Sequence, residues 1–190
     1  MKISVRTQKM NSLEREMKAK RSLPLAPANL VFGEGSFTAD IFFIGEAPGA
    51  KEDELIRPFV GRSGQLLTKM IESIGLKRED VYISNIVKRR PPENRDPLPK
   101  EIDAYTPYLK KQIEIIKPKI IVTLGRFSMN YFMPEGKITR DQGKIFRLDD
   151  KLLMPMFHPA AALRGTKNLN EFKAGFLKLK KLLDKGFISE

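Results

Sequence analysis

The chain has 190 residues, of which 41% are hydrophobic and 31% are charged, as is typical of a globular domain with a sizeable core. Lysine and arginine exceed aspartate and glutamate by 35 to 23, and this formal charge of +12 favours a polyanionic partner such as nucleic acid. There is no cysteine and only one histidine, which excludes disulfides, a cysteine nucleophile and a Cys/His zinc site.

Two regions are expected along the chain. Residues 1–28 are expected to form a helical extension packed on the core, with Asn11 as the cap of a short charged helix. Residues 29–190 are expected to form a single domain. No apolar run is long enough to span a membrane, and the N-terminus lacks the apolar core of a signal peptide. We therefore expect a cytoplasmic protein with no membrane partner.

Apolar strands and amphipathic helices alternate through the domain. The runs "ADIFFIG", "DVYISNIV", "KIIVTLG" and "LLMPMF" predict four buried strands. Helical patterns lie between and after them, at residues 66–74, 100–116, 126–132 and 169–185, and the segment "GKITRDQGKIFRLDDK" is expected to form a hairpin of polar strands. This alternation predicts the α/β class, with a parallel sheet covered by helices on both faces.

The loops at the carboxyl ends of the strands are the expected ligand site, because open parallel sheets bind ligands there. The segments "GEAPG", "SNIVKRRPPENRDP", "TLGRFSMN" and "HPAAALR" leave those ends, so one pocket should collect residues that are far apart in sequence. "GEAPG" matches neither the phosphate-binding P-loop nor the dinucleotide fingerprint, which argues against a nucleotide cofactor. An ordinary tight turn is the alternative for this segment, although three acids, Glu46, Glu52 and Asp53, cluster there.

The second of these loops combines bases with three stiffening prolines, which suits contacts to phosphates. A solvated charged loop is the alternative; the bases are Lys88, Arg89, Arg90, Arg95 and Lys100. Asn85, at a strand end, has an amide that can both donate to and accept from a base edge, or can cap the strand.

The fourth segment holds the sole histidine, His158, which is placed where this fold binds its ligand, although a lone histidine is more often structural. Leu163 and Arg164 follow it as an apolar tip and a base, a pair suited to wedge a duplex step and hold a phosphate. The alternative for this pair is the first turn of a helix.

Taken together, "GEAPGAKEDELIRPFVGRSGQLL", "DVYISNIVKRRPPENRDP", "PKIIVTLGR" and "HPAAALR" closely resemble the family 4 uracil-DNA glycosylases of archaea and thermophilic bacteria. The similarity runs from about Val31 to Arg164. It implies a three-layer αβα sandwich with a central four-stranded parallel sheet. It also implies an enzyme that flips uracil out of DNA, hydrolyses its N-glycosidic bond without a soluble cofactor, and so initiates base excision repair.

The resemblance also implies roles for individual residues. Phe59 corresponds to the aromatic that stacks on the extruded uracil, Asn85 to the residue that pairs with the uracil edge, and His158 to the residue that contacts a uracil carbonyl. Glu46 and Asn94 correspond to positions tied to catalysis. Glu52 is a candidate wall against the 5-methyl group of thymine. The remaining positions implied for the uracil pocket are Gly45, Ala47 and Gly49; those implied for DNA contact are Lys88, Arg89, Arg90, Arg95, Leu163 and Arg164.

Two features of the chain depart from related patterns. Other branches of the superfamily carry a water-activating aspartate where this chain has Ala47, so the motif leaves the residue that positions water unassigned. Members of family 4 hold a [4Fe–4S] cluster through four cysteines, and the corresponding positions here are Lys18, Arg21, Arg89 and Tyr105. None of these replaces a thiolate, so we expect the cluster, and any other metal, to be absent.

Two alternative functions stay open at this point. One is a non-catalytic DNA-binding homologue, such as a polymerase-associated module. The other is a glycosylase with shifted specificity, for hypoxanthine, xanthine or thymine mispaired with guanine. The expected partner is uracil-containing DNA, single- or double-stranded, with replication or repair proteins as further candidates and a monomer as the expected state.

Overall fold

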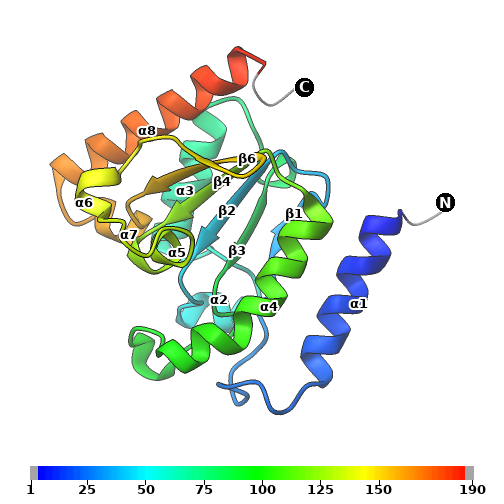
Figure 1. Ribbon diagram of the computed structural model, residues 1–190. Helices are drawn as coiled ribbons and strands as arrows, with labels where there is room; N and C mark the ends of the chain where they lie inside the picture. The colour runs from blue at the N-terminus through cyan, green and yellow to red at the C-terminus, as the bar shows by residue number, and fades with distance from the viewer. Residues whose placement is uncertain (1–3, 187–190) are drawn as a thin grey trace.

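The structure, a computed structural model, describes residues 4–186 (Figure 1). A sheet with strand order β1-β3-β2-β4-β6-β5 lies between two layers of helices. The strands are β1 Glu34–Gly35, β2 Ile41–Gly45, β3 Tyr82–Asn85, β4 Ile120–Leu124, β5 Phe146–Leu148 and β6 Lys151–Met156. The helices are α1 Val5–Ala19, α2 Ala50–Leu55, α3 Arg62–Ser73, α4 Pro99–Ile116, α5 Arg126–Phe132, α6 Ile138–Asp141, α7 Pro159–Ala162 and α8 Thr166–Asp184, with 3₁₀ turns η1 Arg78–Asp80 and η2 Pro92–Asn94.

The four inner strands, β3, β2, β4 and β6, are all parallel, and the short edge strands β1 and β5 pair antiparallel to them. The expected α/β class and the three-layer arrangement are confirmed. The expected four-stranded parallel sheet is present as the centre of a mixed sheet of six strands. No helix within residues 4–186 has the length and apolar character needed to cross a membrane.

Alternating strand residues serve the two faces of the sheet. Phe43, Ile83 and Val122 lie side by side in register and pack under α3 and α8. Their sequence neighbours Phe42, Tyr82 and Ile121 point to the opposite face, where α4 and α1 cover them. Both sides of each inner strand are therefore buried, which is why these strands appear in the sequence as continuous apolar runs.

The N-terminal segment forms α1, which lies alongside α4 on the outer side of the sheet (Figure 1). Met10, Leu13 and Met17 are buried in the same apolar cluster as the strand residues beneath α4. The expected Asn11 cap is wrong: Ser4 caps the helix by accepting from the backbone N–H of Thr7, and the helix therefore starts earlier.

The expected polar hairpin is only half correct. Its second part, Phe146–Leu148, pairs antiparallel with the start of β6. Its first part forms the short helix α6 instead, because the Asp141 carboxylate accepts from the backbone N–H of Lys137 and closes the helical turn.

Candidate functional site

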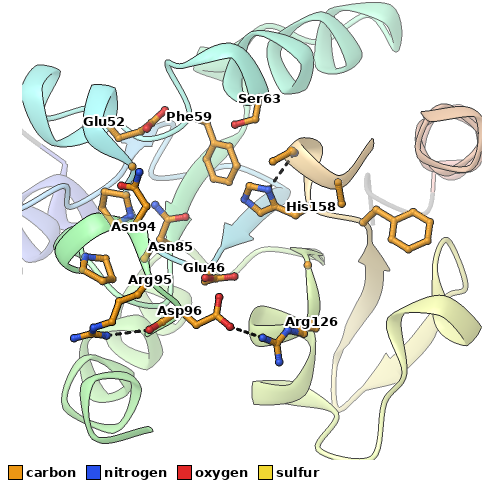
Figure 2. A pocket seen from close by; sticks show the side chains of 18 of the residues that line it. Glu46, Glu52, Phe59, Ser63, Asn85, Asn94, Arg95, Asp96, Arg126 and His158 are labelled. Carbon is orange, nitrogen blue, oxygen red and sulfur yellow. Dashed lines mark hydrogen bonds and ion pairs between the residues drawn. The ribbon is translucent and has the colours of Figure 1, made fainter. Parts of the chain in front are cut away.

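A pocket of about 600 Å³ lies at the carboxyl ends of the parallel strands (Figure 2). Each of the four loops expected at this edge contributes to it, because the crossover connections bring all four strand ends to one side of the sheet. The volume is in the range of small-molecule sites in proteins. The residues that line it include Glu46, Glu52, Phe59, Ser63, Asn85, Asn94, Asp96, Arg126 and His158.

Phe59 forms one wall of the pocket, and its ring is almost entirely buried. The ring lies over Gly45, where a Cβ atom would come within 2.4 Å of the Phe59 Cζ. The backbone of Phe59 has a φ of +51°, which is uncommon for a side chain of this size. Gly64 lies against that backbone, since a Cβ there would be 2.0 Å from the Phe59 carbonyl. Gly45 and Gly64 thus make room for the aromatic wall.

Asn85, the last residue of β3, is 1% exposed and lines the pocket. Its Oδ1 atom is buried and has no hydrogen-bond partner among the described residues. Leaving such an atom unpaired is unfavourable by roughly 1–3 kcal/mol. A buried polar group of this kind at a pocket wall is suited to a ligand that supplies the missing donor.

His158 follows β6 and is the N-cap of α7. Its Nδ1 atom accepts a hydrogen bond from the backbone N–H of Ala160 at 3.2 Å, drawn as a dashed line in Figure 2. Burial lowers the pKa of His158 to about 4. The imidazole is therefore neutral near pH 7, and the proton resides on Nε2 because Nδ1 is the acceptor. His158 can donate from Nε2 into the pocket without carrying a charge.

Glu46 begins the first loop and lies on the side of the pocket nearest Asp96 and Arg126 (Figure 2). Burial raises the pKa of Glu46 to about 7, helped by the negative charge of Asp96 and opposed by the positive charge of Arg126. Its carboxyl group can therefore exchange a proton near neutral pH, which an ordinary glutamate cannot do. A carboxyl group with such a pKa in a pocket is typical of catalytic sites.

Glu52 lines the pocket but also has a structural function. Its Oε1 atom accepts from the backbone N–H groups of Val60 and Gly61 at 2.9 and 2.7 Å. The carboxylate therefore anchors the loop that carries Phe59. Asn94 lies on the pocket rim with a φ of +55°, and its Oδ1 accepts from Arg90 Nε at 2.8 Å.

The expected uracil-pocket and catalytic positions come together in one place. Ala47 and Gly49 line the same cavity as Glu46. Gly45 lies directly behind the wall of this cavity that Phe59 forms. Of the bases expected to contact DNA, Arg95 and Arg164 line the pocket. Leu163, which precedes Arg164, is 38% exposed.

Lys88 was expected to contact DNA, and the structure contradicts this. Its side chain is fully buried, and Nζ donates to Ser84 Oγ and Gln112 Oε1, both at 2.6 Å. A residue enclosed beneath the sheet cannot reach a phosphate. Arg89 is also turned away from the pocket, since its guanidinium donates to the carbonyl groups of Ala26 and Ala28.

Three pocket residues were not singled out from the sequence. Asp96 and Arg126 form an ion pair at the mouth, at 2.5 Å, and Ser63 lines the wall near Phe59 (Figure 2). Arg126 directly follows the glycine that ends the third predicted strand. Its position in the sequence therefore indicates that it lies at the carboxyl edge of the sheet. The partnership with Asp96 joins segments far apart in the chain and has no local signature.

The donor chemistry of the described residues does not suit a metal or an iron–sulfur cluster. Within residues 4–186 there is no group of three or more His, Cys, Asp or Glu side chains placed to hold a metal ion. Of the positions aligned with cluster cysteines, Arg89 binds backbone carbonyls and Tyr105 donates to the carbonyl of Pro24 at 2.7 Å. Lys18 pairs with Glu14 at the surface.

Comparison with known proteins agrees with this geometry. Residues 32–180 match the model of the uracil DNA glycosylase superfamily. The chain is 48% identical over 164 residues to a type-4 uracil-DNA glycosylase of Sulfurisphaera tokodaii, covering 81% of this chain and 74% of that one. It is 40% identical over 187 residues to the type-4 enzyme of Archaeoglobus fulgidus, covering 93% and 94% of the two chains. A third relative, the type-4 enzyme of Saccharolobus solfataricus, is 47% identical over 82% of this chain and 76% of its own. The chain therefore belongs to the uracil DNA glycosylase superfamily, and within it to the type-4 family.

Proposed function

We infer that this protein is a uracil-DNA glycosylase, which removes uracil from DNA by hydrolysing the N-glycosidic bond and so initiates base excision repair. Relatives that carry this name are 40–48% identical over most of the chain. The observation that carries the inference is the meeting of a buried aromatic ring, an unpaired buried amide oxygen and a neutral histidine donor in one pocket. Each of the three suits one part of an extruded uracil.

We propose that uracil is recognised as follows. A base must leave the helix stack to reach the pocket, which costs a few kcal/mol, and stacking on an aromatic ring offsets roughly 1–3 kcal/mol of this. Phe59 is the stacking platform. The unpaired Oδ1 of Asn85 accepts from the N3–H of uracil, and the Asn85 amide donates to the neighbouring carbonyl. Cytosine has no N3–H, so it leaves this oxygen unpaired and is rejected.

We propose that catalysis depends on His158 and Glu46 on two sides of the base. As the glycosidic bond breaks, negative charge gathers on the uracil oxygens and positive charge on the sugar. The Nε2–H of His158 donates to the uracil oxygen and stabilises the negative charge. The Glu46 carboxylate, in its ionised form, stabilises the positive charge and orients the attacking water. Asn94 supports this side of the site from the rim.

The DNA contacts are proposed to come from the exposed part of the pocket rim. Arg95 and Arg164 bind phosphates, and Leu163 enters the space that the extruded base leaves. These contacts do not depend on sequence and suit single- or double-stranded DNA. We further propose that the protein acts as a monomer, in the cytoplasm, with replication or repair proteins as partners.

We propose that the protein folds and acts without an iron–sulfur cluster. No cysteine exists in the chain to hold one. Arg89 and Tyr105, at two of the cluster positions, instead join the core to the segment that leads from α1 to the domain, through hydrogen bonds to the carbonyls of Pro24, Ala26 and Ala28. These polar contacts give this segment the bracing that the cluster gives in other members.

One experiment decides between the candidate functions. The protein is incubated with oligonucleotides that contain U·A, U·G or single-stranded uracil, and with matched oligonucleotides that contain hypoxanthine, xanthine or a T·G mismatch; alkali then cleaves abasic sites. Cleavage of the uracil substrates is the expected result. Cleavage confined to the other bases would indicate shifted specificity. DNA binding with no cleavage of any substrate would indicate a non-catalytic module and overturn the proposal.

A further inference from the structure

Arg78 lies outside the set of pocket-lining residues, yet it holds the backbone on which the pocket's aromatic wall stands. It belongs to the 3₁₀ turn η1, which precedes β3. Its Nη2 donates to the carbonyl of Pro58 at 2.6 Å, and its Nη1 donates to the carbonyl of Phe59 at 3.0 Å. A single planar guanidinium thus fixes two successive peptide groups, which is a use to which arginine is suited.

The other donor groups of the Arg78 guanidinium also have hydrogen-bond partners. Nε donates to Glu34 Oε1 at 2.7 Å, and Nη1 donates to Thr68 Oγ1 of α3 at 2.9 Å. The side chains of Arg78 and Glu34 are only 17% and 22% exposed. Burial alone would raise the pKa of Glu34, but hydrogen bonds from Arg57 and Arg78 outweigh it and lower the pKa. The pair therefore stays ionised, and Arg78 has one defined orientation.

The backbone at Phe59 needs such a support. A φ of +51° at a bulky residue is strained and persists only where its surroundings impose it. Three successive peptide groups at Phe59 are held: Arg78 binds the carbonyls of Pro58 and Phe59, and Glu52 accepts from the N–H groups of Val60 and Gly61. Without the carbonyl contacts, the loop can relax to an ordinary conformation, which turns the ring away from Gly45.

We propose that Arg78, buttressed by Glu34, is a positioning residue that sets the place of the uracil platform Phe59 without touching the substrate. This inference rests on the proposed function for its effect on catalysis. The contacts themselves are independent of any activity. A misplacement of about 1 Å in a reacting complex can lower the rate on the order of 10²-fold.

The test compares Arg78→Gln with Arg57→Gln. Arg57 is a matched control because it binds the same carboxylate, Glu34 Oε2 at 2.7 Å, while its side chain is 58% exposed and makes no described hydrogen bond to the loop carbonyls. In single-turnover cleavage of U·A duplex we expect Arg78→Gln to lose roughly 10- to 100-fold. We expect a smaller loss on single-stranded uracil, which costs less to extrude. Arg57→Gln should stay within about two-fold of wild type.

A double variant separates positioning from general stability. If Arg78 acts through Phe59, then Arg78→Gln in the Phe59→Ala background should cause no further loss of rate. If the rate losses of the two single variants multiply in the double variant, the proposal is overturned. A folded Arg78→Gln protein with the wild-type rate would also overturn it. Arg78→Lys should not rescue, since one ammonium cannot reach both carbonyls and Glu34. If Arg78→Gln fails to fold, Glu34→Gln takes its place: it retains an acceptor but not the charge, and an unchanged U·A rate in it would overturn the proposal.

Amide NMR signals of Val60 and Gly61, selectively labelled with ¹⁵N, report the loop independently of activity. They should shift in Arg78→Gln and stay in place in Arg57→Gln. Absence of cleavage by the wild-type protein would refute the proposed function alone, and the NMR comparison would still decide whether Arg78 holds the loop. Unchanged Val60 and Gly61 signals in Arg78→Gln would refute the positioning role.

Discussion

The imidazole of His158 lies beside the ring of Phe59, with the ring centroids 5.7 Å apart and the planes tilted by 31°. The two residues come from distant loops and meet because both strand ends open on the same edge of the sheet. The flat wall and the hydrogen-bond donor therefore stand at a fixed spacing before substrate arrives. In the proposed mechanism, this spacing places the donor where charge develops in the transition state.

Replacement of His158 should slow chemistry more than binding. A donor fixed at the uracil oxygen binds the transition state more strongly than the ground state, and removing one such donor lowers the rate by about 10²–10³-fold. We therefore expect His158→Ala to lose roughly that much in single-turnover cleavage, with affinity for undamaged duplex almost unchanged. A lower melting temperature with a normal rate in the folded protein would instead make His158 a structural N-cap.

Loss of the Phe59 ring should affect paired uracil most. If Phe59 is the stacking platform, Phe59→Ala removes the stacking that offsets extrusion, and U·A costs more to open than U·G or single-stranded uracil. We expect the rate deficit to fall in the order U·A, U·G, single strand. Cleavage of the three substrates by Phe59→Ala and wild type gives this order directly. An equal deficit on all three would point to a distorted pocket.

Much of the fold follows from local sequence patterns. The apolar runs predicted the four parallel strands because each strand is buried on both faces, as Phe42 and Phe43 illustrate with their packing on opposite layers. The rule that parallel sheets bind ligands at their carboxyl edge then predicted that Glu46, Asn85 and His158 would meet. Both predictions use apolar patterns within single segments, combined with a general rule about where parallel sheets bind ligands.

The features that were missed depend on contacts between distant segments. Lys88 has the local appearance of a loop base, but Gln112, on α4, accepts from its Nζ in the interior. Ser4 and Asn11 are both acceptable helix caps by residue type, and the burial of Met10 decides for the earlier start. The clamp of Arg78 on Phe59 joins residues 19 positions apart through backbone carbonyls, which no side-chain pattern reveals.

The burial of Lys88 leads to a prediction about DNA binding. Lys88→Met should leave DNA affinity and its salt dependence unchanged, since the Lys88 side chain is enclosed in the core. A lost phosphate contact, in contrast, lowers the salt slope by about 1. Arg164→Gln at the pocket mouth is the control in which we expect this drop. Titration of undamaged duplex at several salt concentrations measures both variants, and a reduced slope in Lys88→Met would restore it as a DNA contact.

Lys88 should also change how stability depends on pH. Burial holds the pKa of Lys88 well below its usual value. The folded chain therefore binds this proton less tightly than the unfolded chain, so this group makes stability rise with pH up to the ordinary lysine pKa of about 10. Lys88→Met should therefore show a smaller rise in unfolding free energy between pH 8 and 10 than wild type. Denaturant titrations at these pH values measure the difference.

The proposed absence of a cluster has a direct chemical test, and Arg89 tests the contacts proposed to replace it. Purified protein should contain no stoichiometric iron or sulfide and show no broad visible absorption. Arg89→Met removes the contacts to the carbonyls of Ala26 and Ala28, so we expect faster proteolysis within residues 20–28. Arg21→Met, at an exposed cluster position, is the control expected to behave as wild type. Stoichiometric iron in the protein would contradict the cluster-free proposal.

The raised pKa of Glu46 predicts the pH dependence of catalysis. If the ionised carboxylate is the active form, the cleavage rate should rise about ten-fold per pH unit on the acid side and level off above the Glu46 pKa of about 7. His158 cannot produce this limb, because burial lowers its pKa to about 4 and it stays neutral throughout. Single-turnover rates on a single-stranded uracil oligonucleotide between pH 5 and 8.5 measure the profile.

Two variants identify the group whose titration causes the rise in rate on the acid side. In Glu46→Gln the rate should be low and flat across the range, while in His158→Ala it should be low but still rise towards pH 7. Stability supplies an independent check with a defined sign. A carboxyl group whose pKa is raised on folding binds its proton more tightly in the folded state, so its contribution to stability falls as pH rises from 4.5 through about 7. Wild type should therefore lose more unfolding free energy over this interval than Glu46→Gln. If the cleavage rate of Glu46→Gln still rises with pH on the acid side, another group is responsible for the titration.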